Sequence, residues 1–173
     1  IYYTVGWSAT EAEEHPEWCV RNVDGSFAAL HWDPEARAED PRPATSWKYL
    51  CPSGEYAALM LAQTEEICRL YEVDGLWYDI CNTYPVCYCE NCRRGMRAEG
   101  IDLADEEAVF GYNVAKWKRF QAQCEAIVHG RHRGAGLFFN GTTKLNTPNR
   151  NEAFRMYEFN TQHDLEDLPT TWG

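Results

Sequence analysis

The sequence has few basic residues and no long apolar run. It holds 16 Lys and Arg against 27 Asp and Glu, so its formal net charge at pH 7 is −11. A phosphate backbone or an anionic lipid surface requires a basic face, which this balance does not supply. No stretch approaches the about 20 apolar residues of a membrane-spanning helix, and no basic start followed by an apolar segment resembles a signal peptide. We therefore expect a soluble chain whose partners are neutral or cationic ligands, with neither nucleic acid nor membrane among them.

A disulfide scaffold is also not indicated, although the chain has eight cysteines. They do not follow the even, loop-closing spacing of small secreted domains, so we expect a reducing, cytoplasmic compartment. Apolar residues make up 45% and aromatic residues 14% of the 173 positions, which predicts a folded domain with a sizeable core. The chain starts inside a strand-like run at Ile1 and stops at Gly173 directly after a tryptophan. We interpret it as a segment of a longer protein.

Strand-like and helix-like segments alternate along the chain. Continuous apolar runs predict strands at 1–7, 75–80 and 136–140, with a fourth at 156–163. Apolar residues at helical spacing predict helices at 55–71, 91–99 and 105–129. This alternation is typical of right-handed βαβ units and a parallel sheet. The segment at about 8–53 shows no sustained period and is broken by prolines, so we interpret it as a long loop that binds or covers a ligand.

Polar or aromatic side chains follow each predicted strand, namely Trp7, Asp79, Asn140 and His163. In a (β/α)8 barrel, catalytic residues come from the C-terminal ends of several strands. A doubly wound open sheet is the alternative, but no glycine-rich nucleotide-binding loop follows any strand. We therefore predict the fold class α/β, a (β/α)8 TIM barrel of which this chain holds a central part. Residues 1–173 would form one partial catalytic domain.

Asp79 is the first candidate catalytic residue. An Asp at a strand end can simply bond to loop amides. Here Trp77 and Tyr78 provide ring surfaces of the kind on which sugars stack, and Asn82 and Tyr84 add hydrogen-bonding groups. These neighbours favour a carbohydrate site. The candidate substrate-binding residues are Trp7, His15, Trp18, Tyr78, Asn82, Tyr84, Asn140 and His163.

A glycosidase needs a second carboxylate. One of the pair acts as nucleophile or base, and the other protonates the departing oxygen. Glu166 is our choice, with Asp164, Asp167 and Glu158 as alternatives. Asp164 lies two residues earlier, and we expect only one of Asp164 and Glu166 to face the site.

Cys87, Cys89 and Cys92 are three thiols within six residues. A tetrahedral zinc ion accepts such a group readily, whereas a core packs it poorly. Cys51 and Cys81 are the candidates for the fourth ligand, and a closed set of four thiolates would make the zinc structural. We expect the neighbouring Arg93 and Arg94 to offset the charge of this centre.

Several segments together resemble the hypothetical glycosyl hydrolase group, of the glycosyl hydrolase 6 type, that includes the family 151 α-L-fucosidases. They are the segments 1–7, 15–18, 74–79, 87–94 and 164–173. In the related family 29 α-L-fucosidases, the nucleophile ends a strand similar to Leu76-Trp77-Tyr78-Asp79. The resemblance thus implies a retaining exo-α-L-fucosidase with Asp79 as nucleophile and Glu166 as acid/base. It also implies a carbohydrate substrate and allows a homo-oligomer in the full-length protein.

The cysteine cluster is similar to the zinc knot of the family 42 β-galactosidases. In that family an earlier Cys-Pro segment supplies the fourth ligand, which here implies Cys51 from Cys51-Pro52 rather than Cys81. Family 42 enzymes have Asn-Glu where this chain has Tyr78-Asp79, which argues against their activity here. A β-galactosidase-like enzyme and a non-catalytic carbohydrate-binding barrel with structural zinc are the alternative functions, and a zinc-dependent hydrolase is a third.

Overall fold

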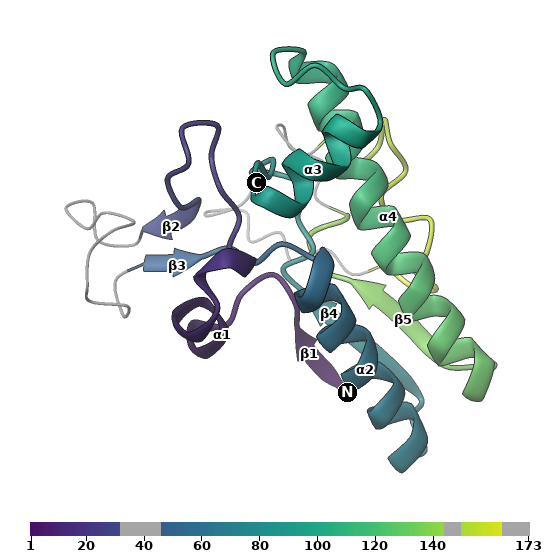
Figure 1. Cartoon of the computed structure of the whole chain (residues 1–173). Coiled ribbons are helices and arrows are strands. Elements are labelled where there is room, and N and C mark those ends of the chain that lie inside the picture. Colours follow the sequence, from purple (N-terminus) through teal and green to yellow (C-terminus); the bar gives the residue numbers. More distant parts are fainter. Residues whose placement is uncertain (32–45, 144–149, 164–173) are drawn as a thin grey trace.

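The computed structural model describes residues 1–31, 46–143 and 150–163 (Figure 1). Their helices and strands follow in the order β1 (Tyr2–Thr4), α1 (Ala9–Glu14), the 3-10 helix η1 (Pro16–Trp18), β2 (Ala29–His31), β3 (Ser46–Lys48), α2 (Gly54–Leu70), β4 (Gly75–Asp79), α3 (Glu90–Ala98), α4 (Glu106–Arg131) and β5 (Gly136–Phe139). The three long predicted helices and the first three predicted strands are confirmed, with shifted ends. Within the described ranges, no helix is long and apolar enough to cross a membrane.

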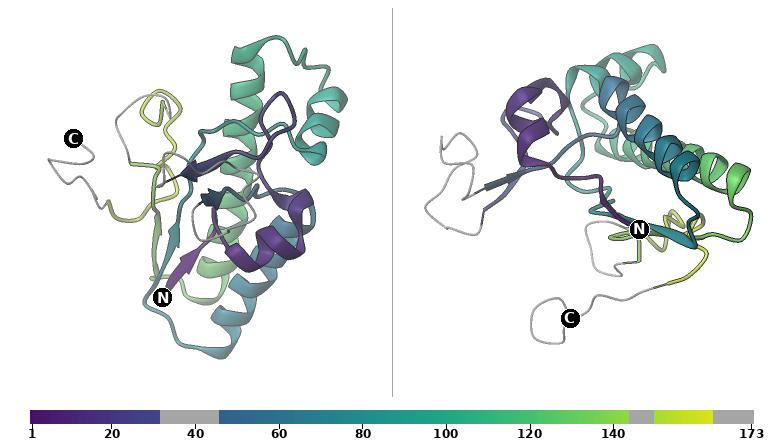
Figure 2. Two further views of the ribbon diagram at one scale, coloured as in Figure 1. Left: turned by 90° about the vertical axis from the view of Figure 1, so that its left-hand side faces the viewer. Right: turned by 90° about the horizontal axis from the view of Figure 1, so that it is seen from below.

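The main sheet is parallel, and its strand order is β1-β4-β5. The long helices α2 and α4 pack together on one face of this sheet (Figure 2). Leu76 and Tyr78 of β4 point to that face and are buried, while Trp77 and Asp79 alternate to the other face and are half-buried. The central strand therefore places its last carboxylate on the face away from the two helices.

The expectation of a TIM barrel is wrong for the part of the chain that the structure describes. Its parallel sheet has three strands and does not close on itself. Alternating strand and helix patterns indicate a parallel sheet, but closure depends on strand number, tilt and stagger, which the patterns do not encode. The correct fold class here is an open α/β unit with a separate two-stranded antiparallel sheet, β2-β3.

The strand predicted at 156–163 is also wrong. Residues 151–159 form consecutive turns, and residues 161 and 162 form a bend instead of an extended strand. Two side chains that follow these turns bond to the backbone of β5. Asn160 Oδ1 accepts the Phe139 N–H at 3.0 Å, and Thr161 Oγ1 accepts the Leu137 N–H at 2.7 Å. The segment thus lies beside β5 without forming a regular strand.

The segment at 8–53 contains more secondary structure than a loop. Its described residues include α1, η1 and the β2-β3 sheet. Ser8 caps α1 by accepting the Glu11 N–H at 3.3 Å. The Tyr88 N–H donates to the Arg21 carbonyl at 2.8 Å, and the Cys51 N–H donates to the Trp18 carbonyl at 2.9 Å. The first bond ties the segment to the cysteine-bearing loop that follows β4, and the second joins two residues of the segment itself.

Candidate active site and metal centre

Asp79 lies at the C-terminal end of β4, and its carboxylate takes hydrogen bonds from both neighbouring strands. Asn140, which follows β5, donates its Nδ2–H to Asp79 Oδ1 at 2.7 Å. The Tyr2 hydroxyl, from β1, donates to Asp79 Oδ2. The Ile80 N–H adds a third bond, to Oδ1 at 2.9 Å. Charge-assisted bonds from three directions fix the orientation of this carboxylate.

The backbone directly after Asp79 is strained. Ile80 has a φ of +57°, a conformation that a β-branched residue rarely adopts. Gly6 lies against it, and a Cβ at position 6 would overlap the Ile80 carbonyl oxygen. A glycine is therefore required where the chain leaving β1 passes the end of β4. Strain of this kind concentrates at functional sites.

Tyr78 is not available to a ligand, which corrects its assignment as a substrate-binding residue. It is 0% exposed, and its ring stacks on Phe139 with centroids 4.8 Å apart. Its hydroxyl donates to Thr64 Oγ1 on α2 at 3.2 Å. Successive strand residues point to opposite faces, so Tyr78 and Asp79 cannot both face one site.

Trp7, His15 and Trp18, the predicted substrate-binding residues of the N-terminal segment, each stack against another ring. Trp7 packs against Trp47 with ring centroids 4.7 Å apart. His15 stacks on the buried Trp18 at 3.7 Å, and its Nδ1 lies 3.0 Å from Glu17 Oε1. His15 and Trp18 are thus preassembled as a ring pair, and their contact with a sugar stays a prediction.

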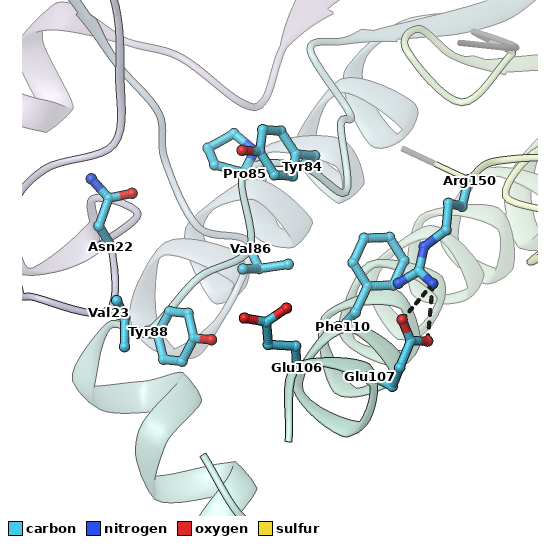
Figure 3. Close-up of a pocket in the computed structure, with 10 residues that line it drawn as sticks. All are labelled: Asn22, Val23, Tyr84, Pro85, Val86, Tyr88, Glu106, Glu107, Phe110 and Arg150. Carbon is cyan, nitrogen blue, oxygen red and sulfur yellow. Dashed lines mark hydrogen bonds and ion pairs between the residues drawn. The ribbon is translucent and has the colours of Figure 1, made fainter. Parts of the chain in front are cut away.

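Asn82 and Tyr84 lie in the loop after β4. Asn82 Oδ1 is buried and has no hydrogen-bond partner among the described residues. Gly141 lies against this oxygen, and a Cβ at position 141 would collide with it. Tyr84 is 49% exposed and lines a cavity to which Asp79 does not contribute (Figure 3). The structure therefore separates Tyr84 from the carboxylate with which the sequence grouped it.

The structure describes only part of the segment in which the second carboxylate was predicted. His163 is exposed and contacts the edge of Tyr157, with centroids 5.6 Å apart. Glu158 pairs with Lys118 at 2.9 Å, so it is engaged elsewhere. Glu166, with its alternatives Asp164 and Asp167, lies outside the described residues.

Four cysteine side chains from three parts of the chain meet at one point. Cys51 precedes α2, Cys87 and Cys89 lie in the loop between β4 and α3, and Cys92 lies in α3. The sulfurs of Cys51, Cys87, Cys89 and Cys92 all lie within 4.8 Å of one another, and all four residues are buried. Cys51 Sγ and Cys92 Sγ are 3.6 Å apart. Zinc–sulfur bonds of about 2.3 Å in a tetrahedron place sulfurs about 3.8 Å apart, so this donor set fits a four-thiolate metal site. The four residues could therefore hold a metal ion.

Cys81, the alternative fourth ligand, lies elsewhere. It belongs to the core under the main sheet, and its thiol faces the Tyr78 carbonyl at 3.6 Å. Burial raises the pKa of the Cys81 thiol well above its usual value. In contrast, hydrogen bonds from Cys87, Cys89 and Cys92 hold the pKa of Cys51 well below its usual value. The geometry favours Cys51, as the family 42 resemblance implied.

Lys116 of α4 is part of this centre, and the sequence interpretation missed it. Its Nζ lies 3.3 Å from Cys51 Sγ and 3.7 Å from Cys92 Sγ. It also donates to Asn113 Oδ1 at 2.8 Å, and that oxygen accepts the Cys87 N–H at 2.9 Å. Burial alone would lower the pKa of Lys116, but the neighbouring thiols raise it well above its usual value. The sequence feature that could have indicated this role is a lysine at a position where the helical spacing of α4 expects an apolar, buried residue.

Arg93 and Arg94 do not balance the charge of the cysteines as expected. Arg93 donates to the carbonyls of Tyr88 and Val23, each at 2.8 Å. Arg94 donates to Asn91 Oδ1 at 2.6 Å. Both arginines thus bond to oxygens away from the sulfurs, and in the described part of the chain the buried ammonium of Lys116 is the cation beside the thiols.

Comparison with known proteins finds a similar solved structure but no matching family. No family model matches the chain, and a search of curated proteins finds no match. Among solved structures, the chain is similar to the α-L-fucosidase isoenzyme 2 from Paenibacillus thiaminolyticus, with 25% sequence identity and a TM-score of 0.78. The match covers 100% of this chain and 24% of that enzyme, so the chain spans about a quarter of its length.

Proposed function

We propose that this chain is part of a retaining exo-α-L-fucosidase in which Asp79 is the nucleophile. One observation carries the proposal: a chain similar in structure to an α-L-fucosidase ends its central strand with a carboxylate that Tyr2 and Asn140 orient from both sides. A carboxylate held in one orientation can attack the anomeric carbon without first reorganising. Strand ends of a parallel sheet are also where ligands of α/β proteins bind.

The chemistry follows the two-carboxylate scheme of retaining glycosidases. Asp79 would displace the departing oxygen and form a glycosyl ester, which water then hydrolyses. Glu166 is proposed as the group that protonates the departing oxygen and later activates the water. Trp7, His15, Trp18, Asn82 and Asn140 are proposed to contact the sugar.

The intact protein is expected to hydrolyse nitrophenyl α-L-fucoside at least roughly tenfold faster than the other nitrophenyl glycosides of a panel, because the shape of a sugar pocket discriminates among epimers. Release of nitrophenol measures the rates, and NMR of the first-formed sugar should show retained configuration. Faster cleavage of the β-D-galactoside would favour the β-galactosidase-like alternative. Fucose binding without turnover of any glycoside would favour carbohydrate binding without catalysis.

We propose that the four cysteines bind a structural zinc ion. A buried set of four thiolates leaves no position open for water, which argues against a catalytic metal. When bound, the ion supplies a cross-link between Cys51 and the segment from Cys87 to Cys92. Since this segment belongs to the connection that starts at Asp79, the cross-link would limit the motion of the chain leaving the candidate active site.

Lys116→Met is expected to weaken zinc binding by roughly 10- to 100-fold, as loss of an outer partner of metal ligands typically does. Methionine keeps an unbranched apolar side chain that is one atom shorter, and it removes the ammonium that faces Cys51 and Cys92. Competition with a chromogenic chelator measures the affinity. Lys118→Met is the matched control, because Lys118 lies on the same helix and pairs with Glu158 instead. Unchanged zinc affinity in a folded Lys116→Met variant would exclude this role for Lys116.

A further inference from the structure

A cavity of about 550 Å³ lies between the loop after β4 and the start of α4 (Figure 3). This volume is within the range of about 300–1,000 Å³ that small-molecule pockets occupy. Asp79 and the four clustered cysteines do not line it. The residues that do are Asn22, Val23, Tyr84, Pro85, Val86, Tyr88, Glu106, Glu107, Phe110 and Arg150.

Two polar groups in the cavity have no protein partner in the described part of the chain. Tyr88 is only 8% exposed, yet its hydroxyl bonds to no other described residue. Figure 3 shows this hydroxyl directed toward the carboxylate of Glu106, which is likewise unpaired among the described residues. This hydroxyl is not among the side-chain atoms that are buried without a partner, so it opens into the cavity that Tyr88 lines. A phenol hydroxyl can both donate to and accept from the hydroxyl groups of a ligand.

The charges of the cavity disfavour an anionic ligand. Arg150 is its one cation, and both its carboxylate contacts go to Glu107, at 2.9 Å each. The same guanidinium lies 3.8 Å from the Phe110 ring centroid, which further fixes it against the wall. The Glu106 carboxylate, exposed in the first turn of α4, has no cationic side-chain partner among the described residues, so the side chains that line the cavity carry a net negative charge. Such a charge favours neutral or cationic molecules over uronates, sulfates and phosphates.

The walls of the cavity are mainly apolar and ring-shaped. Tyr84 presents a half-exposed ring at the cavity, and Pro85, Val86 and Phe110 add apolar surface. Rings and flat aliphatic groups contact the C–H faces of a pyranose, while a carboxylate accepts hydrogen bonds from its hydroxyls. Rings, one carboxylate and one phenol hydroxyl that opens into the cavity together match a neutral sugar better than a purely apolar ligand.

We propose that this cavity is a second carbohydrate site, which binds a neutral saccharide away from Asp79. Sugar hydroxyls would donate to Glu106 and accept from the Tyr88 hydroxyl, with a sugar face against Tyr84. The proposal rests on the proposed carbohydrate function but not on catalysis by Asp79. It deepens that function, because a second site would hold a part of a longer glycan that the reacting site does not contact.

Valine methyl NMR of the intact protein tests the site directly. Val23 and Val86 line the cavity, and Val128 in the main core serves as the internal reference. The probes are L-fucose, D-galactose and lactose, with D-galacturonate as the anionic counterpart. We expect saturable shifts of the Val23 and Val86 signals with at least one neutral probe, and at least about tenfold weaker binding of the uronate. These shifts should persist in Asp79→Asn.

Glu106→Gln is expected to weaken the binding of the neutral probe about tenfold, because it replaces a charged acceptor by a neutral one. Glu99→Gln, at an exposed position after α3, is the matched control and should bind normally. Absence of shifts at Val23 and Val86 with every neutral probe would overturn the proposal. Equal or tighter binding of the uronate, or unchanged affinity in Glu106→Gln, would also overturn it. Methyl shifts in a protein without fucosidase turnover would support the second site while refuting the proposed catalytic function.

Discussion

Asp79→Ala is expected to lower the turnover of nitrophenyl α-L-fucoside on the order of 10⁴-fold or more, and added azide is expected to restore part of it. The large loss follows because no other group can form the glycosyl ester once the nucleophile is removed. Azide fits the space left by the carboxylate and attacks the same face of the sugar, so it yields a glycosyl azide of inverted configuration. Turnover assays with and without azide, followed by product NMR, measure both effects.

The matched control for this experiment is Asp74→Ala. Asp74 immediately precedes β4, is exposed, and lies at the opposite end of the strand from Asp79. We expect near-normal turnover from this variant, since Asp74 lies at the N-terminal end of β4 and the candidate site lies at the C-terminal end. Unchanged activity in Asp79→Ala, or a loss that azide does not rescue with formation of a glycosyl azide, would contradict the nucleophile role.

The position of Asp79 was predictable because apolar runs locate strands well, and a carboxylate directly after such a run marks a strand end. The role of Tyr2 was not predictable. It depends on register: Tyr2 pairs with Trp77, so its side chain shares a face with Asp79 two residues further on. Register between strands that are more than 70 residues apart is a tertiary property, which the local pattern does not contain.

The errors in the sequence interpretation have a related cause. Tyr78 was grouped with Asp79 because they are adjacent, although alternation along a strand sends adjacent side chains to opposite faces. The barrel was inferred from the order of elements, which a three-stranded open sheet shares. The turns at 151–159 replace the strand predicted at 156–163, because side-chain bonds from Asn160 and Thr161 take up amides of β5. In each case tertiary contacts decided the outcome.

The metal centre shows the same division between local and tertiary signals. Cys87, Cys89 and Cys92 are close in sequence, so their clustering was predictable from spacing alone. Cys51 required a resemblance, because it lies 36 residues before Cys87 in the chain. Lys116 was missed because a lysine is almost always a surface residue, and only the packed position of α4 shows that this one faces thiols.

Cys51→Ala is expected to lower the free energy of unfolding by roughly 3 kcal/mol or more, because it removes one ligand and most of the metal affinity. For a chain of this length, such a loss lowers the melting temperature by roughly 6–12 °C. Thermal unfolding followed by circular dichroism measures the shift. A strong chelator should lower the melting temperature of the unmodified protein and leave that of Cys51→Ala almost unchanged, since the variant has little metal to lose.

Cys68→Ala separates the loss of a ligand from the loss of a buried thiol. Cys68 is also a free, buried cysteine, but it lies in the core under the main sheet, away from the cluster. We expect this variant to bind zinc normally and to keep the full response to the chelator. If Cys51→Ala and Cys68→Ala changed the melting temperature equally, and the chelator acted on neither the unmodified protein nor the variants, the four cysteines would contribute through packing alone. A chelator effect that disappears only in Cys51→Ala would instead show that metal binding holds the connection between Asp79 and α3 in place.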